Sequence, residues 1–424
     1  MSSPTAAPTK FEAWKKSSPA DRWARSLLFT RMRDLRIGTL RIIEGSDTAI
    51  FGGEEGGGSL EATIRVRDPR FYRDVIYGGT VGAAESYMEG RWFVDDLTNL
   101  VRLLLVNFSQ MERLDSSWTR LYAPLHRLAH LFRKNTLSGS RKNILSHYDL
   151  GNEFFSLFLD ESLTYSSAIF EREGSTLKEA QLEKLDRICR KLSLSPREHV
   201  IEIGGGWGSF AIHAAETYGC RVTTTTISEE QFSLAKQRVE ERGLSDRVDV
   251  VKKDYRDIPG RYDKLVSIEM IEAVGHHYFD TFFQRCSDLL KPEGAMALQA
   301  ITIPDAEYER HRRTVDFIKR YVFPGSCIPS VARILKSISR KTDMRMVHLE
   351  DITPHYAKTL RTWRENFFRN IDRVREMGFG EHFIRMWEFY LCYCEGSFAE
   401  RYNGDLQMIF TKPKSRLEPG LTPT

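Results

Sequence analysis

The chain has 424 residues, more than one ordinary domain usually holds, so two or three domains are expected. About 41% of the residues are hydrophobic and 28% are charged, which is typical of a folded protein and excludes a disordered or low-complexity chain. Because 58 Asp and Glu residues nearly balance 62 Lys and Arg residues, the net charge is only +4, and any basic surface has to be local.

Six cysteines are scattered along the chain without a C-x-x-C pair. This spacing argues against a disulfide framework and a zinc site, so no metal is expected and a reducing cytoplasm fits. The N-terminal segment has no apolar run of the length that a secretory signal needs, and no window reaches the about 18 apolar residues of a membrane span. We therefore expect a cytoplasmic protein that binds membranes at most peripherally.

The first part of the chain is predicted to be a disordered tail, residues 1–25, followed by a small α+β domain, residues 26–120. Short alternating runs between Gly38 and Arg67, joined by glycine-rich turns, predict a small antiparallel sheet. Helices are expected after this sheet over residues 68–77, 80–90 and 96–110.

Residues 121–145 form a connector of different character. It carries basic residues and no acidic one between His126 and Lys142, beside apolar residues at helical spacing. Such a stripe is typical of a helix on a membrane surface, but an amphipathic helix packed on its own domain fits equally well. The basic residues are Arg127, Arg133, Lys134, Arg141 and Lys142, and the apolar ones are Leu125, Leu128, Ala129 and Phe132.

From residue 177 to residue 301 the pattern alternates between helix and strand. Such alternation predicts an α/β fold with right-handed βαβ units on a parallel sheet, within a domain over residues 146–412. Residues 413–424 are expected to be a C-terminal tail. Strands are predicted over 199–203, 221–226, 248–252, 262–268, 295–301 and 406–411, and helices over 177–192, 211–218, 229–242 and 278–290.

The strongest local signal follows the first of these strands. Gly204, Gly206 and Gly208 form G-x-G-x-G, which differs from the G-x-G-x-x-G of dinucleotide-binding proteins. Glycines allow close approach of the backbone to a ligand and expose amide donors at a helix N-terminus, although a tight structural turn is the alternative. The segment resembles the glycine loop of class I S-adenosylmethionine methyltransferases, in which Glu202 matches the usual acid.

The ends of the next two strands also fit a nucleotide-type cofactor. After the second strand stand Thr226, Ile227 and Gln231, without the acid that dehydrogenases place there for the ribose. Hydroxyl and amide groups can still bind ribose by neutral hydrogen bonds. Asp254 and Tyr255 offer a carboxylate and an aromatic face that suit adenine, with an ordinary loop as the alternative.

An ordered series of motifs resembles the cyclopropane fatty acid synthases, which methylate unsaturated acyl chains of phospholipids. The resemblance runs from about residue 140 to 412 and extends to the N-terminal domain of the bacterial members. It implies a class I methyltransferase (Rossmann-like) fold with helical insertions that form an acyl-chain cavity. Besides the glycine loop, the motifs are 147–155, 163–168, 226–231, 254–257, 269–275, 316–325, 355–360 and Trp363.

The resemblance also implies site residues. Tyr165 and Ser166 join the cofactor-binding residues already named, and a bound bicarbonate is implied as the catalytic base. By position Glu272 and Tyr356 match two of its holders. Two positions depart from the family pattern: Ser167 stands where many members have cysteine, and Gln299 where they have histidine. Both can donate hydrogen bonds to an anion, but neither carries the charge of a histidine.

The implied reaction converts a cis double bond to a cyclopropane through a carbocation, which aromatic faces stabilise in a site that excludes water. The two departures leave open a methylene- or methyl-branched product. An inert lipid carrier is a second alternative, and a nucleic-acid methyltransferase, favoured only by the connector, is a third. The expected partner is unsaturated phospholipid at the inner face of the cell membrane, without nucleic acid; a homodimer is left open.

Overall fold

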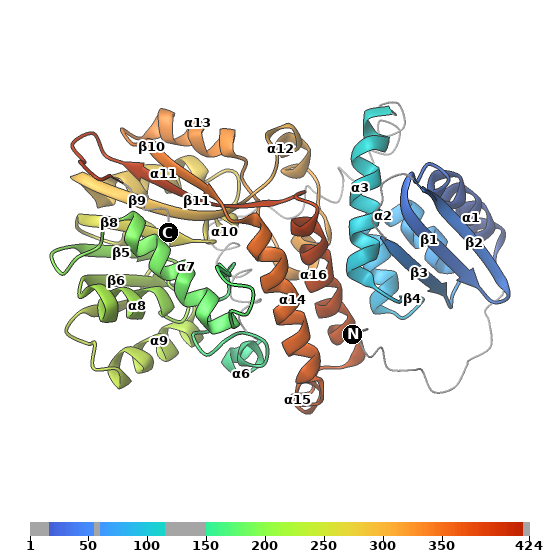
Figure 1. Cartoon of the computed structure of the whole chain (residues 1–424), viewed down its shortest axis with the longest axis horizontal. Helices are drawn as coiled ribbons and strands as arrows, with labels where there is room; N and C mark the ends of the chain where they lie inside the picture. The colour runs from blue at the N-terminus through green and yellow to red at the C-terminus, as the bar shows by residue number, and fades with distance from the viewer. Residues whose placement is uncertain (1–16, 55–59, 115–149, 419–424) are drawn as a thin grey trace. The chain divides into compact units, whose positions relative to one another are not determined.

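The computed structural model describes residues 17–54, 60–114 and 150–418. The chain divides into two compact units (Figure 1). The first combines residues 1–131 with 372–400, and the second combines residues 132–371 with 401–424. Among the described residues, no helix is long and apolar enough to cross a membrane.

The described part of the first unit contains a four-stranded sheet in the order β2-β1-β3-β4. Strand β1 pairs antiparallel with β2 and parallel with β3, and β3 pairs antiparallel with β4. The expectation of a purely antiparallel sheet is therefore wrong, because β3 adds to the free edge of β1 in the same direction. The elements are α1 (Pro19–Met32), β1 (Ile37–Glu44), β2 (Asp47–Glu54), β3 (Glu61–Val66), α2 (Arg70–Met88), β4 (Trp92–Val94), α3 (Leu97–Leu114), α15 (Ile371–Glu376) and α16 (Glu381–Ala399).

Two helices of this unit differ from expectation. Helix α1 begins at Pro19, inside the expected tail, because Ser18 and Asp21 form a reciprocal capping box that satisfies its first amide groups. Helix α2 joins the two helices expected over 68–77 and 80–90. Gly79, with φ of +54°, interrupts the helical backbone between them.

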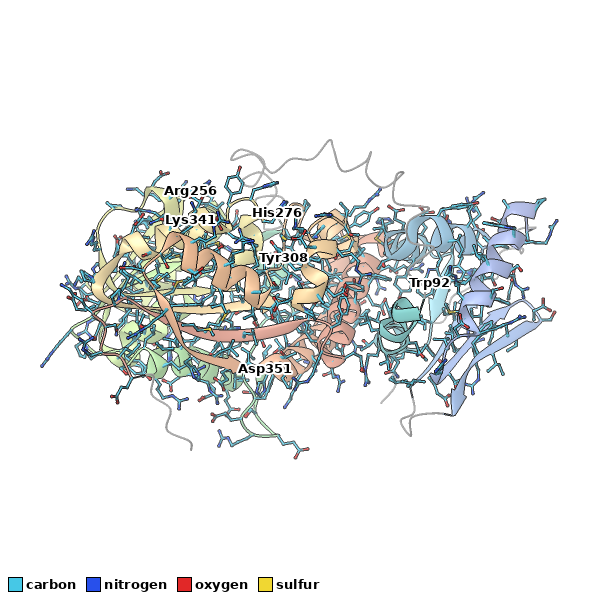
Figure 2. The ribbon with its side chains drawn as sticks, turned by 90° about the horizontal axis from the view of Figure 1, so that it is seen from above. Trp92, Arg256, His276, Tyr308, Lys341 and Asp351 are labelled. Carbon is cyan, nitrogen blue, oxygen red and sulfur yellow. The ribbon has the colours of Figure 1, made fainter. Side chains whose placement is uncertain are left out.

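Helix α16 packs within the first unit although it comes late in the chain. Tyr87 Oη donates a 2.7 Å hydrogen bond to Glu388, and Thr98 donates one of 3.2 Å to Glu395. The ring of Trp92, which is labelled in Figure 2, packs 5.0 Å from that of Tyr87. The last helix of the chain thus belongs to the core of the N-terminal unit.

The described part of the second unit contains a seven-stranded sheet in the order β10-β11-β9-β8-β5-β6-β7. Strands β5 to β9 run parallel, and β11 runs antiparallel to β9 and β10. This arrangement confirms the predicted α/β fold. The elements are α6 (Gly151–Ser156), α7 (Leu177–Lys191), β5 (His199–Ile203), α8 (Ser209–Tyr218), β6 (Arg221–Thr226), α9 (Glu229–Glu241), β7 (Val248–Lys252), η1 (Tyr255–Asp257), β8 (Tyr262–Ile268), α10 (Ile271–Val274), α11 (Phe279–Leu289), β9 (Leu290–Thr302), α12 (Asp305–His311), η2 (Ile318–Val322), α13 (Val331–Lys341), β10 (Arg345–Asp351), α14 (Thr353–Arg369) and β11 (Gly404–Thr411).

Helices cover both faces of this sheet (Figure 1). Leu185 of α7, Phe210 of α8 and Val239 of α9 form one core layer, and Phe283 of α11 and Ile334 of α13 belong to the other. The chain order reverses between β5 and β8, which are neighbours in the sheet. In open α/β sheets, ligands bind at the carboxyl ends of the strands at such a reversal.

Candidate active site

The glycine loop leaves β5 at this reversal. Its Gly204, Gly206 and Gly208 have φ of +86°, +54° and +83°, a left-handed conformation that favours glycine. A Cβ on Gly205 would lie 1.8 Å from Thr224 Oγ1, so the loop is packed tightly onto β6 there. A Cβ on Gly206 would meet no atom within 4 Å. The loop therefore offers open backbone at Gly206, where a ligand could lie close to the chain.

The candidate ribose-binding side chains meet at the ends of β5 and β6. Glu202 is buried and accepts a 2.6 Å hydrogen bond from Thr224, and burial raises the pKa of its carboxyl to about 7. Thr226 Oγ1 donates a 2.8 Å hydrogen bond to Gln231, with the half-buried Ile227 between them in sequence. Thr226 and Gln231 fit a neutral sugar, because their hydroxyl and amide groups can exchange partners with ribose hydroxyls.

The candidate adenine-binding pair lies after β7. Asp254 accepts hydrogen bonds from the backbone amide of Arg256, at 3.0 Å, and from its side chain, at 2.8 Å. This pairing caps the short helix η1. It also occupies the Asp254 carboxylate with Arg256, which is labelled in Figure 2, so fewer of its lone pairs remain for another donor. The ring of Tyr255 packs edge-on against Phe282 at 5.5 Å.

Tyr165 lies in a cluster of aromatic rings that come from distant parts of the second unit. Ring centroids of Phe155, Trp363 and Phe158 lie 5.3, 5.2 and 6.1 Å from that of Tyr165. Phe155, Phe158 and Trp363 are fully buried. Of these four rings only that of Tyr165 is partly exposed, so it is the π face of the cluster that an acyl chain or a developing positive charge can reach.

Next to Tyr165, Ser166 accepts a 2.6 Å hydrogen bond from the ammonium group of Lys184. Lys184 projects from α7 and is fully buried, and burial lowers its pKa to about 8 although Glu269 and Asp405 oppose the shift. Sequence reasoning missed this lysine. Its signal is the spacing, since Lys184 stands four residues from Ala180 and from Ile188 on the buried face of the helix.

The three groups expected to hold an external anion converge instead on the side chain of Glu269. The backbone amide of Ser167 and Nε2 of Gln299 donate to its Oε1, at 2.8 and 2.7 Å. Tyr356 Oη donates to its Oε2 at 2.6 Å. The Ser167 hydroxyl is not part of this set, because it donates to the carbonyl of Ala168.

Glu269 also has an unusual backbone. Its φ is +46°, and its amide donates a 2.8 Å hydrogen bond to the carbonyl of Gln299. The left-handed conformation costs a residue with a side chain roughly 1–2 kcal/mol. The fold therefore keeps a carboxylate at a position where glycine would be conformationally easier.

Glu272, expected as the carboxylate of the anion site, takes a different place. Its Oε1 accepts a 2.6 Å hydrogen bond from the amide of Ile301, and within the described residues its buried Oε2 has no hydrogen-bond partner. Burial, and secondarily the charge of Glu269, raise the pKa of Glu272 to about 8. Glu272 is therefore mostly protonated at pH 7. Ser167, Gln299 and Tyr356 bind Glu269 rather than Glu272.

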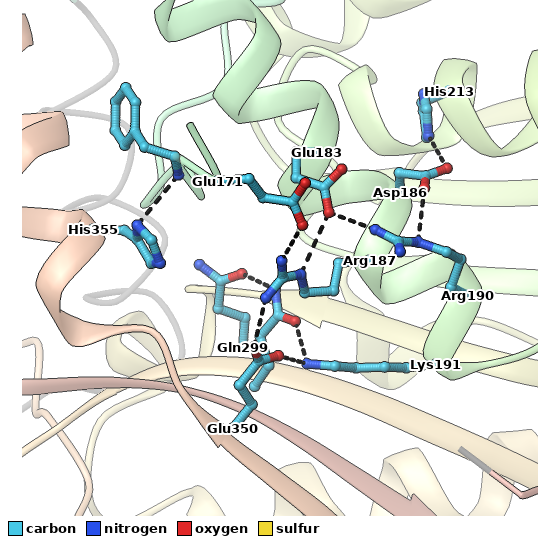
Figure 3. A network of polar contacts seen from close by, with 12 residues as sticks. Glu171, Glu183, Asp186, Arg187, Arg190, Lys191, His213, Gln299, Glu350 and His355 are labelled. Atoms are coloured by element: carbon cyan, nitrogen blue, oxygen red, sulfur yellow. Dashed lines mark hydrogen bonds and ion pairs between the residues drawn. The ribbon is translucent and has the colours of Figure 1, made fainter. Parts of the chain in front are cut away.

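A chain of hydrogen bonds from Lys191 through Gln407 fixes the side-chain amide of Gln299. Lys191 of α7 donates to Gln407 at 2.7 Å, and Gln407 donates to Gln299 Oε1 at 3.0 Å. Figure 3 shows Lys191 and Gln299 at the ends of this chain, with Glu350 beside Lys191. Gln299 Nε2 also reaches the buried Asp405 at 3.1 Å.

The sheet order and the glycine loop at its reversal define the chain as a class I S-adenosylmethionine-dependent methyltransferase. More particularly, it belongs to the mycolic acid cyclopropane synthetase family, whose model matches residues 135–408. Tuberculostearic acid methyltransferase UfaA1 of Mycobacterium tuberculosis is 39% identical over 370 residues, covering 86% of this chain and 85% of the relative. Cyclopropane-fatty-acyl-phospholipid synthase of Escherichia coli K12 is 35% identical over 360 residues, covering 84% and 89%.

Solved structures agree with this membership. The cyclopropane synthase MmaA2 from Mycobacterium tuberculosis matches with a TM-score of 0.59 and 28% identity, over 64% of this chain and 98% of that one. The mycolic acid cyclopropane synthase CmaA1 complexed with SAH and CTAB matches with a TM-score of 0.59 and 32% identity, over the same shares.

Proposed function

We propose that this methyltransferase acts on the cis double bond of an unsaturated acyl chain in a phospholipid. The main support is the closeness of two groups. Tyr165 belongs to an apolar aromatic cluster, and two residues later the backbone amide of Ser167 donates to the buried carboxyl group of Glu269. Relatives named for fatty-acid and phospholipid methylation support the substrate class.

Each part of the site has a chemical task in this reaction. When bound, S-adenosylmethionine supplies an electrophilic methyl carbon, and the alkene π electrons form the new C–C bond as the C–S bond breaks. The aromatic faces of Tyr165, Phe155 and Trp363 stabilise the positive charge left on the acyl chain. The burial of Phe155 and Trp363 excludes water, which would otherwise trap the cation as an alcohol.

Two products share this first step. Loss of a proton from the transferred methyl group closes a cyclopropane ring directly. A hydride shift toward the cation followed by the same proton loss gives a methylene branch. A saturated methyl branch additionally requires a reductant, which S-adenosylmethionine does not supply.

The residues around the base favour the methylene branch over the cyclopropane. Gln299 is neutral where a histidine could be charged, and its Nε2 binds the carboxyl group of Glu269. Negative charge near a cation lowers its energy and prolongs its life, which gives a hydride shift time to occur. The identity to a tuberculostearic acid methyltransferase points the same way.

Incubation with vesicles of cis-unsaturated phospholipid and methyl-¹³C cofactor tests the proposal. We expect labelled acyl chains whose proton spectra show exocyclic methylene rather than ring protons. Ring protons would select the cyclopropane product instead. Acyl chains without label, beside a wild-type protein that still binds S-adenosylhomocysteine, would contradict lipid methylation.

The substrate further requires peripheral docking at the membrane surface, which we propose for the same enzyme. The basic connector that is expected to provide it, Leu125–Lys142, lies outside the described residues. Its sequence supports docking, because basic side chains attract anionic lipid headgroups and apolar ones insert between them.

A further inference from the structure

We propose that Glu269 is the catalytic base and takes the proton that leaves the transferred methyl group, in place of a bound bicarbonate. The inference rests on the proposed lipid methylation and deepens it by naming the residue that completes the reaction. It depends on three observations at Glu269: its hydrogen bonds, its surroundings and its backbone.

The site does not fit a bicarbonate ion. The donors that would hold one, the Ser167 amide, Gln299 Nε2 and Tyr356 Oη, are already bonded to the Glu269 carboxyl group. A second anion there would also lie against Glu272 and Asp405, where burial and neighbouring carboxyl groups already raise the pKa of both residues. Adding negative charge to such a group is unfavourable.

The carboxylate of Glu269 can itself accept a proton, as a bound bicarbonate would. Oε1 accepts hydrogen bonds from Ser167 and Gln299, Oε2 accepts one from Tyr356, and the buried carboxyl group of Asp405 also lies at hydrogen-bond range of Glu269. A carboxylate oxygen has two lone pairs, and we assign the proton to Oε2. Burial raises the pKa of Glu269, while Tyr356, Lys184 and the two donors to Oε1 oppose the rise. The raised pKa makes the ionised form of Glu269 a stronger base than an exposed glutamate.

Glu269 and Glu272 differ in their charged and hydrogen-bonding neighbours. Lys184, hydrogen-bonded to Ser166, brings a positive charge toward Glu269. Glu272 Oε1 accepts the Ile301 amide bond, and burial raises the pKa of Glu272 to about 8, so at pH 7 it is mostly protonated and a poor base. Two nearby carboxyl groups commonly differ in this way because both cannot ionise cheaply.

The left-handed backbone of Glu269 is an independent indication of function. Strained residues persist where the surrounding structure holds them, and they cluster at active sites. Here the strain at φ of +46° directs a carboxylate toward groups from three elements: the Ser167 segment, β9 and α14. A purely structural position would be served by glycine at lower conformational cost.

The step balances without a further reagent. A C–H bond of the transferred methyl group breaks, and its proton binds Glu269 Oε2. The electron pair of that bond closes the cyclopropane ring or, after a hydride shift, forms the methylene double bond. The neutral carboxylic acid then returns its proton to solvent before the next turnover.

Three enzymes test the base: wild type, Glu269→Gln and Glu269→Gly. Each is assayed with phospholipid vesicles in buffer freed of carbon dioxide and again with added bicarbonate or formate. We expect wild-type turnover to be insensitive to bicarbonate and Glu269→Gln to lose about 10²-fold or more, the usual scale for a positioned base. Glu269→Gly, which frees the three donors, should regain measurable turnover with formate or bicarbonate.

Binding of S-adenosylhomocysteine, measured by calorimetry, should stay near wild type in both variants. Wild-type turnover that collapses without bicarbonate and returns with it would overturn the proposal. Near-normal turnover of Glu269→Gln would do the same. A wild-type protein that labels no lipid under any condition would contradict the lipid methylation itself, which keeps the two failures distinct.

Discussion

Gln407 and Gln299 lie directly opposite each other on β11 and β9, and Gln407 Nε2 donates to Gln299 Oε1 at 3.0 Å. The ammonium group of Lys191 can only donate, so Gln407 must turn its Oε1 toward Lys191 and its Nε2 toward Gln299. Gln299 then necessarily presents its own Nε2 to Glu269. A buried lysine thus sets the orientation of the amide that holds the proposed base.

Replacing Gln407 by leucine should leave Gln299 Oε1 buried without a donor. An unsatisfied buried acceptor costs about 1–3 kcal/mol, so the free energy of unfolding should fall by that amount in urea denaturation. Turnover should also fall, whereas binding of S-adenosylhomocysteine should hold. The exposed Gln284→Leu on α11 is the matched control; equal effects of the two variants would speak against the positioning chain.

Replacing Gly206 by valine should weaken cofactor binding. The side chain would occupy the open space above the loop, and calorimetric affinity for S-adenosylhomocysteine should drop by at least about tenfold, which corresponds to 1.4 kcal/mol. Gly243→Val controls for backbone strain, because Gly243 has a similar φ of +64° and equally open surroundings after α9. Unchanged affinity in Gly206→Val would refute the assignment of the loop.

The α/β alternation and the glycine loop could be predicted because their signals are local. Strand β5, the loop at Gly204 and helix α8 are consecutive in sequence, so periodicity and spacing suffice. Glu269 was missed as the centre of the site because its partners come from residues 102, 30 and 87 positions away. Its left-handed backbone leaves no mark in the sequence.

The place of α16 could not be predicted for a related reason. The sequence of the helix does not say on which unit it packs, and its contacts, such as that of Glu395 with Thr98, assign it to the first. The parallel pairing of β3 with β1 likewise depends on which edge of β1 is free, since β2 already covers the other.

Stability should depend on pH through Glu272. Its pKa is about 8 in the folded protein against an ordinary value of 4.5, so between these values the folded state binds a proton that the unfolded state has lost. Wild-type free energy of unfolding should therefore fall as pH rises from about 4.5 to 8 and level off above, relative to Glu272→Gln. Denaturation of both proteins across this range checks the difference, with the exposed Glu240→Gln expected to follow wild type.

Reversing the charge of the connector at Arg127, Arg133 and Lys134 to glutamate should weaken vesicle binding. Each basic residue near an anionic surface contributes about 1 kcal/mol at low salt, and screening reduces this as salt rises. Affinity for S-adenosylhomocysteine should hardly change. Co-sedimentation with anionic vesicles over a salt series is the measurement, and a triple variant that sediments like wild type at low salt would assign docking to another part of the protein.

The fate of the transferred methyl group tests the central claim most directly. Wild-type enzyme is given cofactor whose methyl group carries deuterium at all three positions, with cis-unsaturated phospholipid vesicles, and the acyl chains are analysed by mass spectrometry. Removal of a proton from that methyl group, the step assigned to Glu269, predicts product chains that retain two of the three deuterium atoms. Chains that retain all three would show that the proton leaves the acyl chain instead, and would contradict the account.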